Sequence, residues 1–373
     1  MTQFRFPASV SFAAPAWRWS GLAVFFVAAW FVLGALPAAA ISVAVLALFY
    51  ASAGSSFNLL YGSLGIFSLA QPVFVAVGGY ASSFLYVRYG VSPRLGMLAA
   101  MACAAILAVP IGFIAMRRPG TVVTALVTLI VSEAATPILS AITPLGGSIG
   151  LYIPVKSGTN WGALQFATGL PFARLFLALN VLIIAGLMWF GRSRAGLWAA
   201  AIKDCPDAAS ASGVPVLRMR LSIFIASAVI AAVPGVLFAQ YNLLVNADLF
   251  LGDAVLFQLL VVALVGGSAR PWGALVGALV MTELSQYLSN VAGDRPGIGP
   301  LTFAAAFLVM ALAMPRGIAG TWAAFVSARK ARAGGGHDRS PAIPDARDHP
   351  DGNVVPLAGG PSRDAAETET PTG

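Results

Sequence analysis

The chain has 373 residues, of which 58% are hydrophobic and only 10% are charged, and its mean hydropathy is +0.84. Soluble globular domains carry a charge on about a quarter of their residues, so this composition excludes an ordinary soluble domain and favours a protein that spans a bilayer. Basic residues at a cytoplasmic membrane surface account for the formal net charge of +8, and no nucleic-acid partner is expected.

Apolar stretches of membrane-spanning length recur along most of the chain. A run of roughly 20 apolar residues crosses the hydrocarbon as a helix, which satisfies its own backbone groups. The sequence therefore predicts an all-α polytopic membrane protein with about ten transmembrane helices and with broken or re-entrant segments. The predicted spans are 20–38, 40–60, 66–87, 95–116, 120–140, 172–190, 217–240, 253–269, 272–291 and 299–318.

The first two spans leave two questions open. They could form one long broken helix, and the stretch ALPAAA at the end of the first resembles a signal-peptidase site. The apolar run before this stretch is long for a signal peptide, so we expect a retained helix.

Basic residues are distributed unequally between the two sides that these spans define. If the N-terminus is cytoplasmic, an even number of spans returns the C-terminus to the cytoplasm, and most Arg and Lys residues then lie inside. The basic residues left outside are Arg88, Arg94, Lys156, Arg174 and Arg295. The positive-inside rule therefore predicts an N-in and C-in topology.

This topology divides the chain into three parts. Residues 1–19 are expected to form a cytoplasmic N-terminal segment, and residues 20–320 the transmembrane domain. Residues 327–373 are rich in Pro, Gly and charge without periodicity, so they are expected to form a disordered cytoplasmic tail. Two loops exceed simple hairpins: an external loop at 141–171 and a cytoplasmic loop at 191–216.

The residue types needed for catalysis or metal binding are missing from the predicted bundle. The only histidines, His337 and His349, lie in the tail, and no phosphate-cradling Gly-x-x-x-x-Gly-Lys-Ser/Thr motif occurs. The two cysteines, Cys103 and Cys205, fall in a span and in a cytoplasmic loop, too far apart for a disulfide. We expect no catalytic residue, no metal and no cofactor, and therefore no enzyme.

The stretch CPDAASASGVP, residues 205–215, is polar or small throughout and lies in the cytoplasmic loop. It predicts a short helix. Asp204 can cap it, Pro206 fits its first turn, and Asp207 complements the positive end of its dipole. Gly213 supplies the left-handed residue that ends it.

Such a helix suits close docking against another protein. Ala208 and Ala209 are small enough to permit a close approach, while Lys203, Asp204 and Asp207 can fix the orientation. The sequence Asp207-Ala208-Ala209 followed by Gly213 resembles the E-A-A-x-x-x-G signature of permease subunits of ATP-binding-cassette importers, with Asp in place of the commoner Glu. An ordinary capped loop helix is the alternative for this stretch alone.

Four further segments narrow the family. They are residues 57–85 (with Asn58, Gly62, Gly65, Ser68 and Gly79-Tyr80), TPLGGSIGL at 143–151, VVALVGGSARPWGALVGAL at 261–279 and MPRGIAG at 314–320. In this order they resemble the permeases of branched-chain amino acid type importers, in particular the longer of the two paired subunits. The chain departs from that family at Ala70-Gln71, where Gly-His is usual, and at Cys205-Pro206.

The resemblance implies partners, a location and a mechanism. The expected partners are two ATP-binding subunits that use the ATP, a homologous second permease, an external substrate-binding protein and the bilayer of a bacterial plasma membrane. Coupling to the ATPases is expected to involve Lys203, Asp204, Asp207, Ala208, Ala209 and Gly213. The default substrates are leucine, isoleucine and valine, with urea, short amides and small carboxylic acids as alternatives. A secondary transporter and a non-transporting scaffold are the rival functions.

Two carboxylates fall within predicted spans. A charge at membrane depth costs on the order of 3 kcal/mol on insertion scales, so it is rarely present without a use. Glu133 and Glu283 could line a polar pathway and accommodate a substrate ammonium group, or they could be protonated or hydrogen-bonded residues that fix one helix to another.

The connection between the second and third spans is rich in helix-breaking residues. Gly62, Gly65 and Pro72 are expected to interrupt it and to expose backbone groups, which a membrane protein tolerates where they line a cavity. The candidate pathway or gate residues here are Asn58, Gly62, Gly65, Ser68 and Gln71. Close helix packing is the alternative role of Gly62, Gly65, Gly78 and Gly79.

Overall fold

A bundle of long α-helices makes up most of the computed structural model, which describes residues 17–117, 120–155, 162, 164–267, 270–292 and 304. All of these belong to one compact unit, residues 1–326. The predicted tenth span apart from residue 304, the predicted tail and all but the last residues of the predicted N-terminal segment lie outside the described residues. The elements in chain order are α1 Trp17–Ala35, α2 Ala38–Leu64, α3 Gln71–Tyr89, α4 Pro93–Arg117, α5 Thr121–Ala141, η1 Thr143–Leu145, β1 Leu151–Tyr152, α6 Leu170–Phe190, α7 Arg194–Asp204, α8 Pro206–Ala211, α9 Val216–Asn242, β2 Leu244–Val245, α10 Ala247–Leu251, α11 Asp253–Gly266 and α12 Gly273–Ala292.

Each predicted span up to residue 291 corresponds to a helix, with shifted ends. In the described part of the chain, six helical segments are long and apolar enough to cross a membrane: α2, α4, α5, α6, α9 and the pair α10–α11. Helices α3 and α12 fall outside this set because Gln, Ser, Thr and Glu side chains dilute their apolar residues. The chain is therefore a polytopic α-helical membrane protein.

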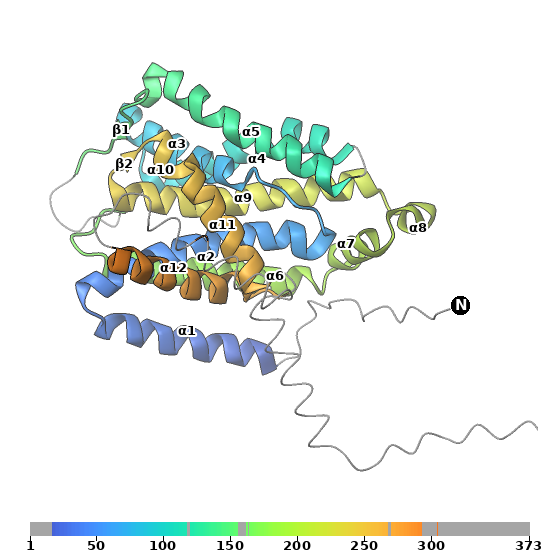
Figure 1. Ribbon diagram of the computed structural model, residues 1–373, viewed down its shortest axis with the longest axis horizontal. Helices are drawn as coiled ribbons and strands as arrows, with labels where there is room; N and C mark the ends of the chain where they lie inside the picture. Colours follow the sequence, from blue (N-terminus) through green and yellow to red (C-terminus); the bar gives the residue numbers. More distant parts are fainter. Residues whose placement is uncertain are drawn as a thin grey trace, which may run out of the picture. The chain divides into compact units, whose positions relative to one another are not determined.

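The first two spans are separate helices. Helix α1 ends at Ala35, Pro37 precedes α2, and α2 then continues to Leu64, beyond the predicted end at residue 60. The chain reverses direction between the two helices, and α1 packs against α6 at the edge of the bundle and not along α2 (Figure 1). This resolves the alternative of one long broken helix.

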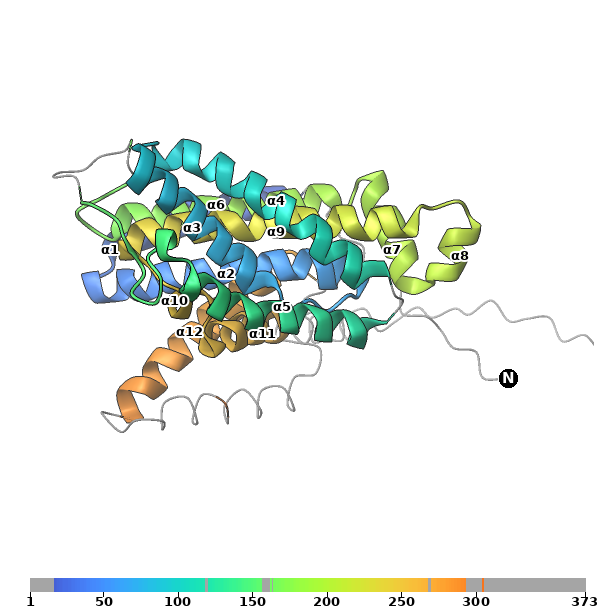
Figure 2. The ribbon, with the colours of Figure 1, turned by 90° about the horizontal axis from the view of Figure 1, so that it is seen from above.

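The two ends of the bundle carry different structures (Figures 1 and 2). At one end β1 pairs antiparallel with β2, with Leu151 opposite Val245, and this ladder joins the predicted external loop to the end of α9. Helices α7 and α8 project from the opposite end, where α1 also begins. The predicted external and cytoplasmic loops therefore lie at opposite ends.

Glycines let α3 and α9 cross in direct backbone contact. A Cβ on Gly78 of α3 would overlap the carbonyl oxygen of Ala232, and a Cβ on Gly235 of α9 would overlap that of Val75. Small residues are the usual means by which membrane helices approach closely, since van der Waals contact replaces the hydrophobic effect in lipid. The alternative packing role of the glycines is thus confirmed at Gly78.

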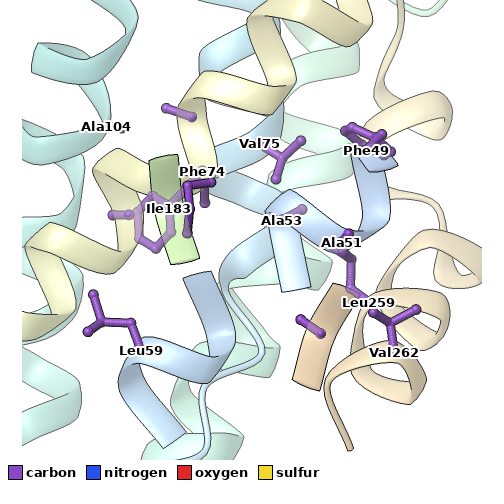
Figure 3. Packing of buried hydrophobic residues seen from close by; sticks show 14 of the residues in the cluster. Phe49, Ala51, Ala53, Leu59, Phe74, Val75, Ala104, Ile183, Leu259 and Val262 are labelled. Carbon is purple, nitrogen blue, oxygen red and sulfur yellow. The ribbon is translucent and has the colours of Figure 1, made fainter. Parts of the chain in front are cut away.

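Aromatic and branched side chains fill the space between the crossed helices (Figure 3). The rings of Phe49 in α2 and Phe238 in α9 stack with centroids 4.0 Å apart, and Phe74 in α3 meets Phe224 of α9 edge-on at 5.6 Å. These contacts place α2, α3 and α9 at the centre of the bundle.

Replacement of Gly235 by alanine should destabilise the protein, because the new methyl group forces α3 and α9 apart. Overpacking of this kind costs about 1–3 kcal/mol. The melting temperature and the yield of the purified Gly235→Ala protein should both be lower than those of wild type. The control is Gly186→Ala in α6, where a Cβ has nothing within 4 Å. Equal melting temperatures for wild type and Gly235→Ala would contradict the packing.

Candidate functional site

The chain leaves helical geometry between α2 and α3, deep in the bundle. Helix α2 ends at Leu64, Gly65 adopts a left-handed φ of 68°, and α3 begins at Gln71 with Pro72 in its first turn. This confirms the break predicted from Gly65 and Pro72. The prediction for Gly62 was wrong in one respect: Gly62 is buried inside the last turns of α2 and does not interrupt the helix.

Side chains of α5 satisfy part of the broken backbone. The amide of Leu69 donates to Thr128 Oγ1 over 2.9 Å, and Thr128 Oγ1 in turn donates to the carbonyl of Thr124. Thr124, Thr128 and Ser132 are spaced four residues apart and are all buried, so the inner face of α5 is polar. Ser68, fully buried in the break, accepts from the Ala70 amide at 3.4 Å.

Gln71 connects three helices at the start of α3. Its Oε1 accepts from Ser56 Oγ of α2 and its Nε2 donates to Ser227 Oγ of α9, each over 2.9 Å. Ser227 Oγ also donates to the carbonyl of Ser56 at 2.7 Å. Gln71 is 2% exposed, so this network fixes the break against α2 and α9 by bonds that water cannot replace.

Asn58 lies two residues beyond Ser56 on α2 and is buried like Gln71, but it lacks the hydrogen bonds that Gln71 forms. It is 1% exposed, yet among the described residues neither its Oδ1 nor its Nδ2 has a hydrogen-bond partner. Leaving a buried amide unsatisfied costs about 1–3 kcal/mol. Such a group is therefore suited to bind a polar molecule that passes through the bundle.

The two intramembrane carboxylates lie elsewhere. Glu133 and Glu283 are both exposed, on α5 and α12, and within the described part of the chain no hydrogen bond to either is present. They do not join the buried cluster of Asn58 and Gln71. Among the described residues, neither glutamate therefore fixes one helix of this chain to another by a hydrogen bond.

Lys203 connects the loop at 191–216 to the break. Its Nζ donates to the carbonyl of Gly62 over 2.8 Å, and its aliphatic stem lies against Gly65, where a Cβ would be 3.5 Å from Lys203 Cγ. Burial lowers the pKa of the Lys203 ammonium group from its ordinary value, and the carboxylate of Asp204 opposes this shift. One side chain of α7 thus contacts both glycines at the end of α2.

The short helix predicted within residues 205–215 forms as α8, with Pro206 and Asp207 in its first turn and Gly213 at a left-handed φ of 83° after its end. The predicted cap was wrong: Asp204 is the last residue of α7, and Cys205 precedes α8 without a side-chain capping bond. The reason is that Arg194–Asp204, which the sequence predicted as loop, forms helix α7. The N-cap of this helix is Ser193.

Helix α8 offers a small and mostly exposed surface. Ala209 packs inward at 5% exposure, whereas Asp207, Ala208 and Gly213 are exposed. A Cβ on Gly213 would have nothing within 4 Å. The six residues predicted for coupling therefore fall into two groups: Lys203 and Ala209 contact the bundle, and the other four lie on the outside of α7, α8 and the turn after it.

Several residues of this site were not identified from the sequence. Ser56 and Ser227 lie 171 positions apart, and no local pattern relates them. Thr124, Thr128 and Ser132 do carry a signal, because their spacing of four places them on one helical face. For metal or cofactor binding, the described residues include no cluster of three or more His, Cys, Asp or Glu side chains, and Cys103 and Cys205 are both free and exposed.

Comparison with known proteins gives relatives among transport permeases. The chain is 25% identical over 258 residues to a probable branched-chain amino acid transport permease protein LivH of Methanocaldococcus jannaschii, covering 63% of this chain and 77% of that protein. It is 27% identical to a probable ABC transporter permease protein y4mJ of Sinorhizobium fredii, over 42% of this chain and 47% of that protein. It is also 30% identical to a xylose/arabinose import permease protein XylH of Sulfolobus acidocaldarius, over 38% of this chain and 35% of that protein. No solved structure matches the chain.

A family model gives the broadest match. Residues 39–314 match the model described as branched-chain amino acid transport system, permease component. This range begins in the first turn of α2, includes all the elements from α3 to α12, and ends at Met314, where the predicted terminal P-R-G segment begins; α1 lies before it. The chain therefore belongs to the family of permease components of branched-chain amino acid transport systems.

Proposed function

We propose that the chain is the transmembrane permease subunit of an ATP-driven importer that moves branched-chain amino acids across a bacterial plasma membrane. In this proposal ten helices cross the membrane, both termini are cytoplasmic, and α7 and α8 lie in the cytoplasm. The chain needs no cofactor of its own. Its partners are two ATP-binding subunits, a homologous second permease and an external binding protein, and this chain corresponds to the longer of the two permeases.

The observation that carries the proposal is the contact between Lys203 and the broken end of α2. A movement of α7 displaces Lys203, whose ammonium group is bonded to the Gly62 carbonyl. The exposed small surface of α8 suits docking on an ATPase, with Asp207 and Gly213 at its two ends. ATP-driven motion at α8 then reaches the break through α7.

The pathway residues in this proposal belong to two groups. Asn58, with its unpartnered amide, meets polar groups of the cargo, while Ser68 and Gln71 hold the break. Exposed Glu133 marks a face of α5 that protein or water covers, since a carboxylate in lipid is costly. We assign that face to the second permease, and we assign the exposed side of Glu283 to a polar environment for the same reason.

Substrate identity is the least constrained part of the proposal. The relatives include one protein named for branched-chain amino acids and one named for xylose and arabinose. Urea, short amides and small carboxylic acids are the further alternatives for this chain. A secondary transporter needs no ATPase and would tolerate a disrupted α8, so the same experiments separate it from the importer.

Uptake of labelled leucine in a strain that lacks the gene tests cargo and coupling together. The wild-type chain should restore uptake, and Gly213→Trp should not, because its indole blocks close docking. Gly213→Asn is the matched control, since Asn tolerates the left-handed φ with little bulk. Leucine uptake that is indifferent to the deletion would rule out the cargo. Full uptake with a membrane-inserted Gly213→Trp chain would rule out the coupling role.

Two leucine substitutions separate a pathway residue from a structural one. Asn58→Leu removes a buried amide that has no described partner, so the melting temperature should stay equal or rise while uptake falls. Gln71→Leu removes two hydrogen bonds and should destabilise the protein by about 1–3 kcal/mol. A strong loss of stability in Asn58→Leu, or full uptake by that variant, would contradict the assignment of Asn58.

A further inference from the structure

A cavity of about 160 Å³ lies beside the break, at the end of the bundle that carries α7 and α8. Five parts of the described chain surround it: the end of α2 and the residues that follow, the end of α4, the start of α5, the junction of α7 and α8, and the first turns of α9. The hydrogen-bonded network of Gln71 is not part of its lining. The cavity is therefore distinct from the polar cluster of the proposed pathway.

Two cationic side chains line this cavity. Lys203 enters it from α7, and Arg220 enters it from α9. Arg220 is half-buried, and its Nε is buried without a hydrogen-bond partner among the described residues. Lys203 has one hydrogen bond, to the neutral carbonyl of Gly62. A buried guanidinium N–H without a partner is costly, so an anion that enters the cavity and accepts from Arg220 Nε would form a charge-assisted bond there.

The remaining lining adds donors and no negative charge. Thr121 of α5 contributes a hydroxyl group, whereas the hydroxyl of Thr124 donates to the carbonyl of Ala115, and α5 begins here without a side-chain cap. No carboxylate is among the described lining residues; Asp204, which acts on Lys203, is exposed outside it. An amino-acid zwitterion would bring an ammonium group next to two cations. A purely anionic group with several acceptor oxygens fits the lining better.

We infer that this cavity is a binding site for a phosphate group, held by Lys203 and Arg220. The guanidinium supplies directed donors, the ammonium group supplies a compact charge, and the Thr121 hydroxyl can donate to a further oxygen. The phosphate is either free or part of an anionic phospholipid headgroup. A bound phosphate joins α5, α7 and α9 beside the break, so it stabilises the arrangement in which Lys203 holds α2. The site does not depend on the identity of the cargo.

The test compares Arg220→Gln with wild type and with Arg218→Gln, an exposed arginine two positions away that does not line the cavity. The purified full-length chain is titrated with inorganic phosphate, against chloride at equal ionic strength, in nanodiscs of phosphatidylcholine or phosphatidylglycerol. The melting temperature is the readout. Wild type and Arg218→Gln should be stabilised by phosphate or by phosphatidylglycerol. Arg220→Gln should need about tenfold more of the effective probe for the same stabilisation, because the variant loses one charged hydrogen bond to the phosphate.

The arms of this experiment also identify the source of the phosphate. Stabilisation by inorganic phosphate in phosphatidylcholine indicates a free anion, and stabilisation by phosphatidylglycerol alone indicates a headgroup. In phosphatidylcholine without phosphate, Arg220→Gln should melt at or above wild type, because it removes an unpaired charge. A wild-type chain that responds to neither probe, an unchanged response in Arg220→Gln, or a lower melting temperature of that variant without phosphate would overturn the site.

Discussion

The structure depends on one constraint: a polypeptide that leaves helical geometry inside a membrane must find partners for its backbone groups within the protein. The chain does this between Leu64 and Gln71. The amide of Leu69 is satisfied by Thr128 of α5, and the carbonyl of Gly62 by Lys203 of α7. The break between α2 and α3 thus depends on a polar face of α5 and on a cationic side chain from α7.

The same constraint explains how neighbouring helices are arranged. Gln71 at the start of α3 forms hydrogen bonds with Ser56 of α2 and Ser227 of α9. Two turns further along α3, Gly78 and Gly235 let the backbones of α3 and α9 come into contact. The core of the subunit is therefore rigid around the break. On the side of α7 and α8 the Lys203 side chain holds the end of α2, and this is the side on which we propose that the ATPases act.

Sequence patterns predicted the features that depend on local chemistry. Gly65 and Pro72 indicated the break, and Pro206 and Gly213 indicated the ends of α8, because each of these residues restricts its own backbone. The cap assigned to Asp204 failed, since the loop before α8 folds into a helix of its own. Gly62 failed as a breaker because helix α2 tolerates a buried glycine where close packing or a carbonyl contact is needed.

Features that depend on tertiary contact were beyond the sequence. Nothing local relates Lys203 to Gly62, and the exposure of Glu133 follows from which face of α5 packs inward. The hydroxyl residues Thr124, Thr128 and Ser132 recur every four positions, so the sequence could have predicted which face of α5 packs inward.

The central claim is that Lys203 transmits motion from α7 and α8 to the break. The most direct measurement is transport per ATP hydrolysed, in proteoliposomes that contain the complete importer with the Lys203→Met chain. The account predicts that hydrolysis continues while uptake per ATP falls well below wild type, because the ATPases still dock on α8 but no longer move α2. Uptake per ATP equal to that of wild type would contradict it.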